Sequence, residues 1–404
     1  MPVLFLIVFV DLVGFGVIIP LLPFFGEHFG ASPAQVGLLM AAYSFTQFLA
    51  APLWGRLSDR IGRRPVLLAS MAGAVGAYIW LGFADTLWML FAARLAGGAM
   101  AGNISTAFAY VADVTEPANR AKGMGLIGAA FGLGFIFGPA IGGALAGSDP
   151  LAADYRSPAL VAAALSGLAL VLTALILKES LSPAARARQA AIPAPTRWRR
   201  FRIALARPSV GLLLAISFLA TFVFAGMETT FAMWSRRSFG WGPEQNGYLF
   251  AFVGLLSAAI QGGLIGRLAK RFGEGRLVVF GSTALALGML MIPFSTSLAP
   301  LLAAMVIVAL GFSLVSPSLN SLISLQVGAD LQGGTMGIAR SVTTLARVMG
   351  PGWAGALFYF IGKDWPFLGG TMVMAAVIGL SLWSLRLVAR DPRAKQSATP
   401  ADRQ

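Results

Sequence analysis

The sequence predicts an all-α integral membrane protein with twelve transmembrane helices, arranged as two pseudo-symmetric bundles of six. Three observations predict this class. Of the 404 residues, 57% are hydrophobic and only 11% are charged, whereas soluble globular proteins carry about 25% charged residues. Apolar stretches long enough to cross the hydrocarbon core as helices recur along the chain. Short motifs of the first half also recur in the second. A water-soluble fold is therefore excluded.

Twelve apolar stretches are expected to form the spanning helices. Residues 277–329 carry no charge, and we divide them at 295–297 and Pro300, because a turn followed by a helix-starting proline fits there. The first stretch lacks a basic leader and a cleavage site, so we expect a retained helix rather than a signal peptide. The stretches cover about 3–25, 32–54, 66–84, 86–112, 123–147, 157–177, 209–234, 245–266, 277–296, 299–326, 335–361 and 366–387.

The basic residues predict the orientation. The net charge is +14, and of the 30 Lys and Arg residues only Arg156, Arg236, Arg237 and Lys363 fall in loops expected outside. Because cytoplasmic loops collect basic residues, both termini are expected to face the cytoplasm. The basic excess is then a topology signal, and no nucleic-acid partner is expected. With no cysteine and one histidine, the sequence also predicts no metal site and no cofactor.

The charge and motif pattern predicts two halves. Residues 178–208 hold eight basic residues and four prolines, which indicates a cytoplasmic linker between a bundle over 1–177 and a bundle over 209–387. A cytoplasmic tail is expected over 388–404. GRLSDRIG at 55–62 recurs as GRLAKRFG at 266–273. A duplicated six-helix layout is typical of transporters that rock two halves about a midplane site.

Four motifs carry a resemblance to a known family. They are DLVGFG at 11–16, GRLSDRIGRRP at 55–65, Arg94 with Gly97, Gly98 and Gly102, and GAAFGLGFIFGPAIGG at 128–143. The sequence resembles the major facilitator superfamily, and most closely its twelve-helix drug/proton antiporters, the group that contains the tetracycline/proton antiporters. The resemblance implies a monomeric, multi-pass carrier in the lipid bilayer of the bacterial cytoplasmic (inner) membrane, which exchanges a small-molecule substrate for protons.

Two acids lie well inside the expected spans, Asp11 and Glu228. A charge at bilayer depth costs about 2.5–3.5 kcal/mol, so each such group is a candidate for function. We expect Asp11 and Glu228 to exchange protons. The alternative is a permanent ion pair with Arg94, Arg340 or Arg347, which also lie within spans.

Substrate binding is expected from intramembrane residues that can contact a polar or aromatic ligand. Amides supply donors and acceptors to a cavity, although they can equally bond helix to helix, and a ring can equally pack in the core. Among the amides, Gln261 matches a glutamine of the tetracycline antiporters. The candidates are Arg94, Gln261, Asn320, Arg347, Gln47 and Phe231.

The second motif predicts a gate at the cytoplasmic face. In the family, the matching acid and arginine join an acid at the inner end of the fourth span, here Asp113, and hold the two halves together in the outward-open state. Glycine and proline in the fifth span permit close packing or bending. The alternative is that the basic residues only set the topology. The predicted gating residues are Gly55, Asp59, Arg63, Arg64, Asp113, Gly138 and Pro139.

Three positions depart from the tetracycline antiporters, which have acids in spans three and nine and a histidine in span eight. This sequence has Ala77, Leu285 and Ser257 there. We therefore expect a secondary active transporter that exports drug-like or amphipathic molecules by alternating access, with a substrate more hydrophobic than tetracycline. The alternative is a lipid or metabolite carrier of the same fold, either exporter or importer, and sodium coupling stays open. The sequence shows no cluster of acid, base and nucleophile at a membrane boundary, so we do not expect an enzyme.

Overall fold

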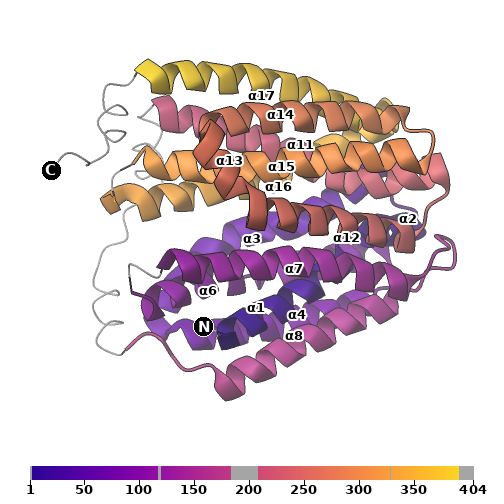
Figure 1. The fold of residues 1–404 in the computed structure, drawn as a ribbon. Coiled ribbons are helices and arrows are strands. Elements are labelled where there is room, and N and C mark those ends of the chain that lie inside the picture. Colours follow the sequence, from indigo (N-terminus) through magenta and orange to yellow (C-terminus); the bar gives the residue numbers. More distant parts are fainter. Residues whose placement is uncertain (1, 117–119, 183–207, 328, 391–404) are drawn as a thin grey trace. The chain divides into compact units, whose positions relative to one another are not determined.

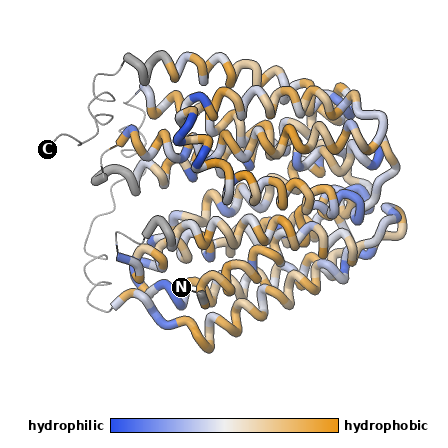
Figure 2. Tube along the Cα trace, in the orientation of Figure 1, coloured by the Kyte–Doolittle hydropathy of each residue, from blue (hydrophilic) through white to orange (hydrophobic). Residues whose placement is uncertain are grey.

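The described part of the chain consists of helices and their connections. The computed structural model describes residues 2–116, 120–182, 208–327 and 329–390, and no β-strand occurs among them (Figure 1). Hydrophobic residues run along most of the helices, whereas hydrophilic residues gather at several helix ends and in α13, Ile265–Phe272 (Figure 2). The predicted all-helical membrane fold is confirmed.

Most helices of the first half are long, but short breaks separate α1 from α2 and α5 from α6. The helices are α1 Pro2–Ile18, α2 Leu22–His28, α3 Pro33–Ile61, α4 Arg63–Gly82, α5 Leu87–Ala99, α6 Asn103–Val114, α7 Arg120–Ala146 and α8 Arg156–Ile176. Those of the second half are α11 Pro208–Phe239, α12 Pro243–Ala259, a π-helical turn Ile260–Leu264, α13, α14 Glu274–Met291, a 3-10 turn Ile292–Phe294, α15 Leu298–Leu325, α16 Ala329–Phe360 and α17 Trp365–Arg390.

Ten stretches of the described residues are long and apolar enough to cross a membrane. The predicted stretch 86–112 is not among them, because it is divided into α5 and α6, of 13 and 12 residues, and a spanning helix needs about 20. The stretch 335–361 lies in α16 up to residue 360, and this helix is also outside the ten. The number of twelve spanning helices therefore stays a prediction.

The interruption between α5 and α6 is held in place by Ser70 of α4. The Ser70 hydroxyl donates to the Met100 carbonyl and accepts from the backbone N–H groups of Gly102 (3.0 Å) and Asn103 (2.9 Å). Backbone groups that a helix break frees in apolar surroundings need such partners. These bonds fix the position of Asn103, which belongs to the site described below.

Contacts divide the chain into two compact units. Unit 1 contains residues 1–194, 225–258 and 347–366, and unit 2 contains 195–224, 259–346 and 367–404. Segments of the second half belong to unit 1 because they bond to helices and loops of the first half there; for example, the N–H of Glu244 donates to the Gly147 carbonyl at 3.2 Å. The predicted bundles, linker and tail stay predictions, since residues 183–207 and 391–404 lie outside the described residues.

The repeated motif has a similar backbone conformation in both halves. α3 ends at Ile61 and α13 ends at Phe272, and each is followed by a glycine with positive φ, +109° at Gly62 and +79° at Gly273. This region of φ favours glycine. In both places the next helix begins directly afterwards, which agrees with an internal duplication.

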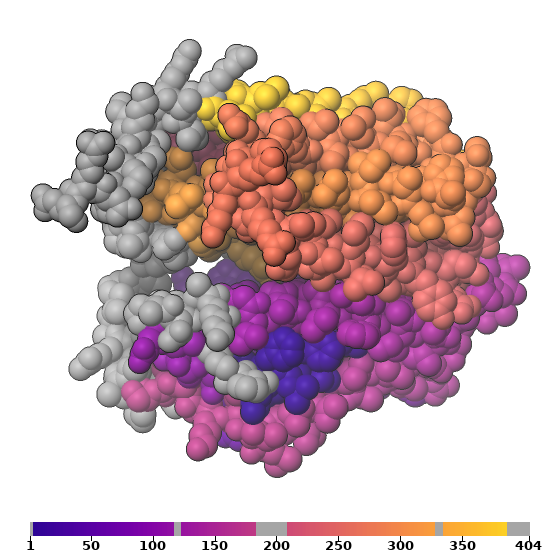
Figure 3. Space-filling view, in the orientation of Figure 1, coloured from indigo at the N-terminus to yellow at the C-terminus, as the bar shows by residue number. Residues whose placement is uncertain are grey.

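Within unit 1, α1 packs between α7 and α8. Figure 3 shows α1 in indigo, flanked by these two helices. On the α7 side the two backbones touch, because a β-carbon added at Gly138 would lie 2.6 Å from the backbone of Gly16. Larger side chains at these positions would separate the helices. The predicted role of Gly138 in close packing rests on this contact.

We expect Gly138→Ala to lower the melting temperature of the purified protein in detergent. The added methyl group meets the α1 backbone, and overpacking of this kind costs about 1–3 kcal/mol. Gly125→Ala is the matched control on the same helix, because its β-carbon would meet nothing within 4 Å. It should be neutral or slightly stabilising. Equal melting temperatures of the two variants would contradict the tight packing of α1 on α7.

Candidate functional site

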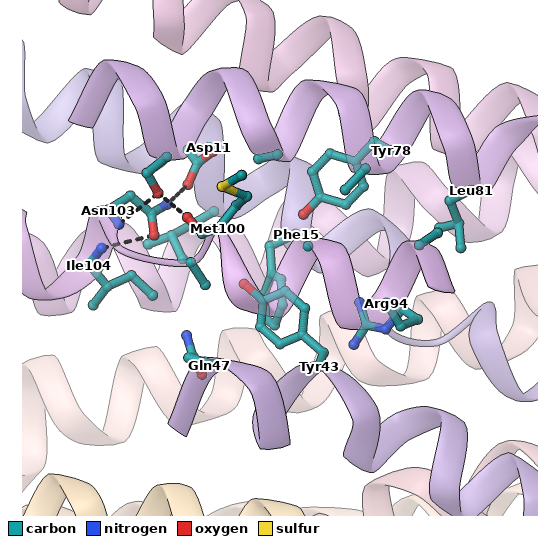
Figure 4. Close-up of a pocket in the computed structure, with 17 residues that line it drawn as sticks. Asp11, Phe15, Tyr43, Gln47, Tyr78, Leu81, Arg94, Met100, Asn103 and Ile104 are labelled. Atoms are coloured by element: carbon teal, nitrogen blue, oxygen red, sulfur yellow. Dashed lines mark hydrogen bonds between the residues drawn. The ribbon is translucent and has the colours of Figure 1, made fainter. Parts of the chain in front are cut away.

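A cavity lies among helices of the first half, within unit 1. Its walls come from α1, α3, α4, α5, the turn after α5 and the start of α6. Figure 4 shows Asp11 and Arg94 apart from each other, with Phe15, Tyr43 and Tyr78 between them. A mainly apolar and aromatic wall with a few polar groups is typical of a small-molecule site, but the volume of this cavity is only about 40 Å³, so a drug-sized ligand requires it to widen.

Asp11, on α1, is buried, with 6% of its surface exposed. One carboxylate oxygen accepts a hydrogen bond from the Asn103 amide, and the other accepts one from the Ser166 hydroxyl of α8 at 3.0 Å. In the described part of the chain Asp11 forms no ion pair. Its neighbours are therefore neutral donors, and the alternative of a permanent bond to an arginine is not seen in this structure.

Arg94, on α5, lines the same cavity and is 5% exposed. Its guanidinium carbon lies 4.6 Å from the centre of the Tyr43 ring. The Nε atom is buried without a hydrogen-bond partner, and Arg94 forms no ion pair with any described residue. The cation is thus held by an aromatic face rather than by an acid.

Gln47, another predicted substrate residue, lies on α3 and also lines the cavity. The structure adds Phe15 and Tyr78 to the wall. Phe15 lies in the motif at 11–16, but the sequence predicts neither residue as part of a binding site. A tyrosine in an otherwise apolar stretch is a usable signal for Tyr78, because a buried phenol group needs polar surroundings. Phe15 carries no comparable signal.

Glu228 and Arg347 lie elsewhere in unit 1, on α11 and α16. The Arg347 Nη1 is 3.6 Å from the Glu228 Oε2, and the side chains are 41% and 12% exposed. This ion pair is the alternative arrangement that the sequence left open for Glu228. Proton exchange at Glu228 and substrate binding at Arg347 stay predictions.

The remaining predicted substrate residues do not line the cavity of Asp11 and Arg94. Gln261 lies in the π-helical turn of unit 2, where its amide donates to the Ser313 hydroxyl at 3.5 Å. Asn320 is exposed on α15. Phe231 is fully buried, with its ring centre 5.7 Å from that of Phe250. A substrate could reach Phe231 only if this aromatic packing opened.

The predicted gating residues Asp59, Arg63 and Asp113 form one cluster in the first half. Arg63 donates from Nη1 to Asp59 Oδ1 at 2.6 Å and to Ser58 Oγ at 2.7 Å, and from Nε to Asp113 Oδ2 at 2.9 Å. Arg63 is 4% exposed. The Ser180 hydroxyl also donates to Asp113 at 2.9 Å. A buried cation shared by two acids ties α3, α4 and α6 together at this end.

Glu179, which the sequence places in a loop, reinforces the cluster. It accepts hydrogen bonds from the backbone N–H groups of Arg63 (2.9 Å) and Arg64 (3.1 Å), at the start of α4. A carboxylate is favoured at a helix N-terminus. Arg64 turns its guanidinium to the Ala174 carbonyl at 2.6 Å. A β-carbon at Gly55 would meet nothing within 4 Å, so packing in this structure does not require glycine there.

A second charge cluster lies at the other end of α3. Glu27 of α2 is 9% exposed and contacts Arg236 Nη1 at 3.0 Å and Arg237 Nη2 at 2.9 Å, both of α11. These pairs join the first half of the chain to the second within unit 1. The sequence gives little warning of them, since the partners are more than 200 residues apart and lie at the ends of apolar stretches.

The chain matches the family model described as Major Facilitator Superfamily over residues 4–351 and 262–403. The chain belongs to the major facilitator superfamily. The matched ranges cover almost the whole length, so this major facilitator protein is a multi-pass membrane transporter and not an enzyme.

Relatives of this major facilitator protein include drug-resistance proteins. Tetracycline resistance protein, class C, of Escherichia coli is 33% identical over 386 residues, which are 94% of this chain and 93% of the relative. Multidrug resistance protein 2 of Bacillus subtilis (strain 168) is 31% identical over 383 residues, 93% of this chain and 92% of the relative. The resemblance to drug/proton antiporters is thereby confirmed at the level of sequence.

Solved structures agree on the fold. The human organic anion transporter MFSD10 (TETRAN) is 28% identical, with a TM-score of 0.73 over 94% of this chain and 98% of its own. The nucleoside transporter NupG has a TM-score of 0.77 at 13% identity, over 95% of this chain and 99% of its own, and it shows the fold alone.

Ala77, Leu285 and Ser257, where the sequence is expected to differ from the tetracycline antiporters, lie in surroundings that differ from one another. Ala77 lines the cavity of Asp11 and Arg94. Leu285 is fully buried, and Ser257 is partly buried. Within the described ranges, no group of three or more metal-ligating side chains is close enough to hold a metal ion.

We expect Arg63→Gln to destabilise this major facilitator protein strongly, because it leaves Asp59 and Asp113 without their shared cation. Removing one partner of a buried ion pair costs roughly 3 kcal/mol. Here the loss comes mainly from Asp113, which is 16% exposed, because Asp59 is 47% exposed. Arg60→Gln, the same change at an exposed residue of the same motif, should cost much less. Thermal unfolding in detergent compares them, and equal losses would show that the Arg63 cluster contributes no more than a surface charge.

Proposed function

We propose that this protein is a proton-coupled secondary transporter of the bacterial inner membrane, which exports drug-like or amphipathic small molecules by alternating access. One observation carries the proposal. Asp11, a buried carboxyl group, borders a cavity with an apolar and aromatic wall, and its hydrogen bonds come from neutral side chains. Gaining or losing a proton there changes the charge of the cavity by one unit.

The partners of Asp11 suggest how a proton would move helices. An ionised carboxylate accepts from both Asn103 and Ser166, whereas a protonated carboxyl group must donate from one oxygen. The Ser166 hydroxyl can change from donor to acceptor, but the Asn103 amide nitrogen can only donate. Protonation on the oxygen that faces Ser166 would therefore reverse the direction of that hydrogen bond while the Asn103 bond is kept, so the change would act at the contact between α1 and α8.

Glu228 would act in a different way. Its carboxylate faces Arg347 across 3.6 Å, so protonation would remove the attraction between α11 and α16. The freed guanidinium of Arg347, which is already 41% exposed, could then contact substrate. Protonation of Asp11 and protonation of Glu228 would thus change two different contacts between helices.

The two charge clusters at the ends of α3 would act as gates on opposite faces of the membrane. With both termini in the cytoplasm, Asp59, Arg63 and Asp113 lie at the inner face, and Glu27 with Arg236 and Arg237 lies at the outer face. The ion pairs of Glu27 join the two halves of the chain. Export would require these pairs to separate, so that the site opens outward.

The relatives support an exporter of drug-like molecules, since they are named as tetracycline and multidrug resistance proteins. The family resemblance implies acids in the tetracycline antiporters where this chain has the apolar Ala77 and Leu285, so we propose a more hydrophobic main substrate than tetracycline. A second candidate function is carriage of a lipid or metabolite. The similarity to a protein described as an organic anion transporter supports it.

We expect Asp11→Asn and Glu228→Gln to abolish coupled transport while the protein still inserts. Compounds that raise the melting temperature of the purified protein are added to proteoliposomes that contain a trapped pH dye. The wild type should move protons opposite to the compound, and each amide variant should reduce this movement at least tenfold. Proton and compound moving in the same direction would indicate a symporter instead.

Asp85→Asn is the control for this experiment, because Asp85 is an exposed acid in the loop between α4 and α5. It should keep the wild-type proton movement. Coupled transport that survives in both Asp11→Asn and Glu228→Gln would exclude these acids as the proton carriers.

A further inference from the structure

We infer that Arg94 binds an anionic group of the transported molecule, and that the cavity takes amphipathic substrates with a carboxylate or a similar anion next to an apolar or aromatic body. This inference deepens the transport function proposed above, and it rests on that function for treating the ligand of the cavity as cargo. It concerns the side of the cavity that lies away from Asp11.

Arg94 is a buried cation without a counter-charge. It is 5% exposed, its Nε has no hydrogen-bond partner, and no acid among the described residues pairs with it. The buried Arg63 differs, since it contacts Asp59 and Asp113 at 2.6 and 2.9 Å. An uncompensated charge in such surroundings is costly. A bound anion would supply the missing partner.

Neither Asp11 nor Tyr43 fills that role. Asp11 is bonded to Asn103 and Ser166, and the rings of Tyr43 and Tyr78 lie between it and Arg94 (Figure 4). The Tyr43 ring attracts the guanidinium through its face at 4.6 Å. This contact orients the cation, but it leaves the buried Nε–H without an acceptor among the described residues.

The wall near Arg94 fits the body of such a ligand. Figure 4 shows Leu81 and the rings of Phe15 and Tyr78 on this side of the cavity, and Ala77 and Ala93 also belong to its lining. A planar guanidinium binds a carboxylate through two parallel hydrogen bonds. The anionic group would bind at Arg94, and the apolar body would lie against these side chains. A ligand with only a positive charge would be repelled at this end.

Three aromatic probes of similar shape test the inference on the purified full-length protein, with no gradient present. They are 1-naphthaleneacetate, the neutral 1-naphthaleneacetamide and the cationic 1-naphthylmethylamine, measured by equilibrium dialysis at pH 7.5. Charge-assisted hydrogen bonds at a buried site predict that the wild type binds the carboxylate roughly tenfold or more tightly than the amide. The cation should bind most weakly. Equal binding of carboxylate and amide by the wild type would overturn the inference.

Variants locate the preference at Arg94. Arg94→Gln should reduce the carboxylate-to-amide ratio to about one, and Arg94→Lys should keep a smaller preference, because lysine retains the charge but not the planar fork. Arg156→Gln is the matched control: Arg156 also lies over a ring, Phe83 at 4.1 Å, but does not line the cavity. It should keep the wild-type ratio. A preference that survives in Arg94→Gln, or disappears in Arg156→Gln, would place the anion site elsewhere.

The experiment separates this inference from the proposed function. If the wild type shows no carboxylate preference but still moves protons against a transported compound, the anion site is wrong and proton-coupled transport stands. If the carboxylate preference is present while transport ignores pH in the wild type, proton coupling is wrong and the anion site stands. If Arg94→Gln does not fold, the wild-type ratio and Arg94→Lys still decide the inference.

Discussion

An ionised side chain within a membrane helix has to find compensation inside the protein, because lipid offers none. A charge that the protein buries at the end of a membrane helix has the same need, and both cases occur in unit 1. Arg63 is shared by two acids, Glu27 is held by two arginines, and Glu228 faces Arg347. In each case the pair also joins separate helices, so charge compensation and helix positioning are the same interaction.

Asp11 and Arg94 satisfy the constraint in other ways, and that difference sets the cavity apart. Asp11 is solvated by an amide and a hydroxyl, and Arg94 by the face of Tyr43. A permanent pair between them would cancel both charges and leave a neutral wall. Because aromatic rings keep them apart, neither charge cancels the other, which is the arrangement that the proposed proton exchange and anion binding require.

The helix packing of unit 1 explains how the acid is held. α1 lies against α7 with backbone contact at Gly138 and against α8, which supplies Ser166. The break between α5 and α6, bonded to Ser70, supplies Asn103. The surroundings of Asp11 therefore depend on the packing of α1 against α7 and α8 and on the start of α6. A change in its protonation acts where these helices meet.

Composition and motif spacing were sufficient for the helical membrane fold and the superfamily, and they singled out Asp11 and Arg94, which line one cavity, and Arg63, which lies in a charge cluster. These features are local, because long apolar stretches and rare charges within them can be read one segment at a time. The break in the fourth stretch could not be read in this way. Ser70, a residue of α4, stabilises a break in the fourth stretch, and no property of that stretch alone reveals it.

The sequence by itself determined which charges lie in lipid surroundings, because hydropathy assigns each residue to a span or a loop. Only the tertiary structure decided their partners. Whether an acid meets an arginine, an amide or a ring depends on contacts between helices that lie far apart in the chain, such as Asp11 with Ser166 or Glu27 with Arg236. Those contacts follow from how the helices pack, and packing is a property of the whole bundle rather than of any one segment.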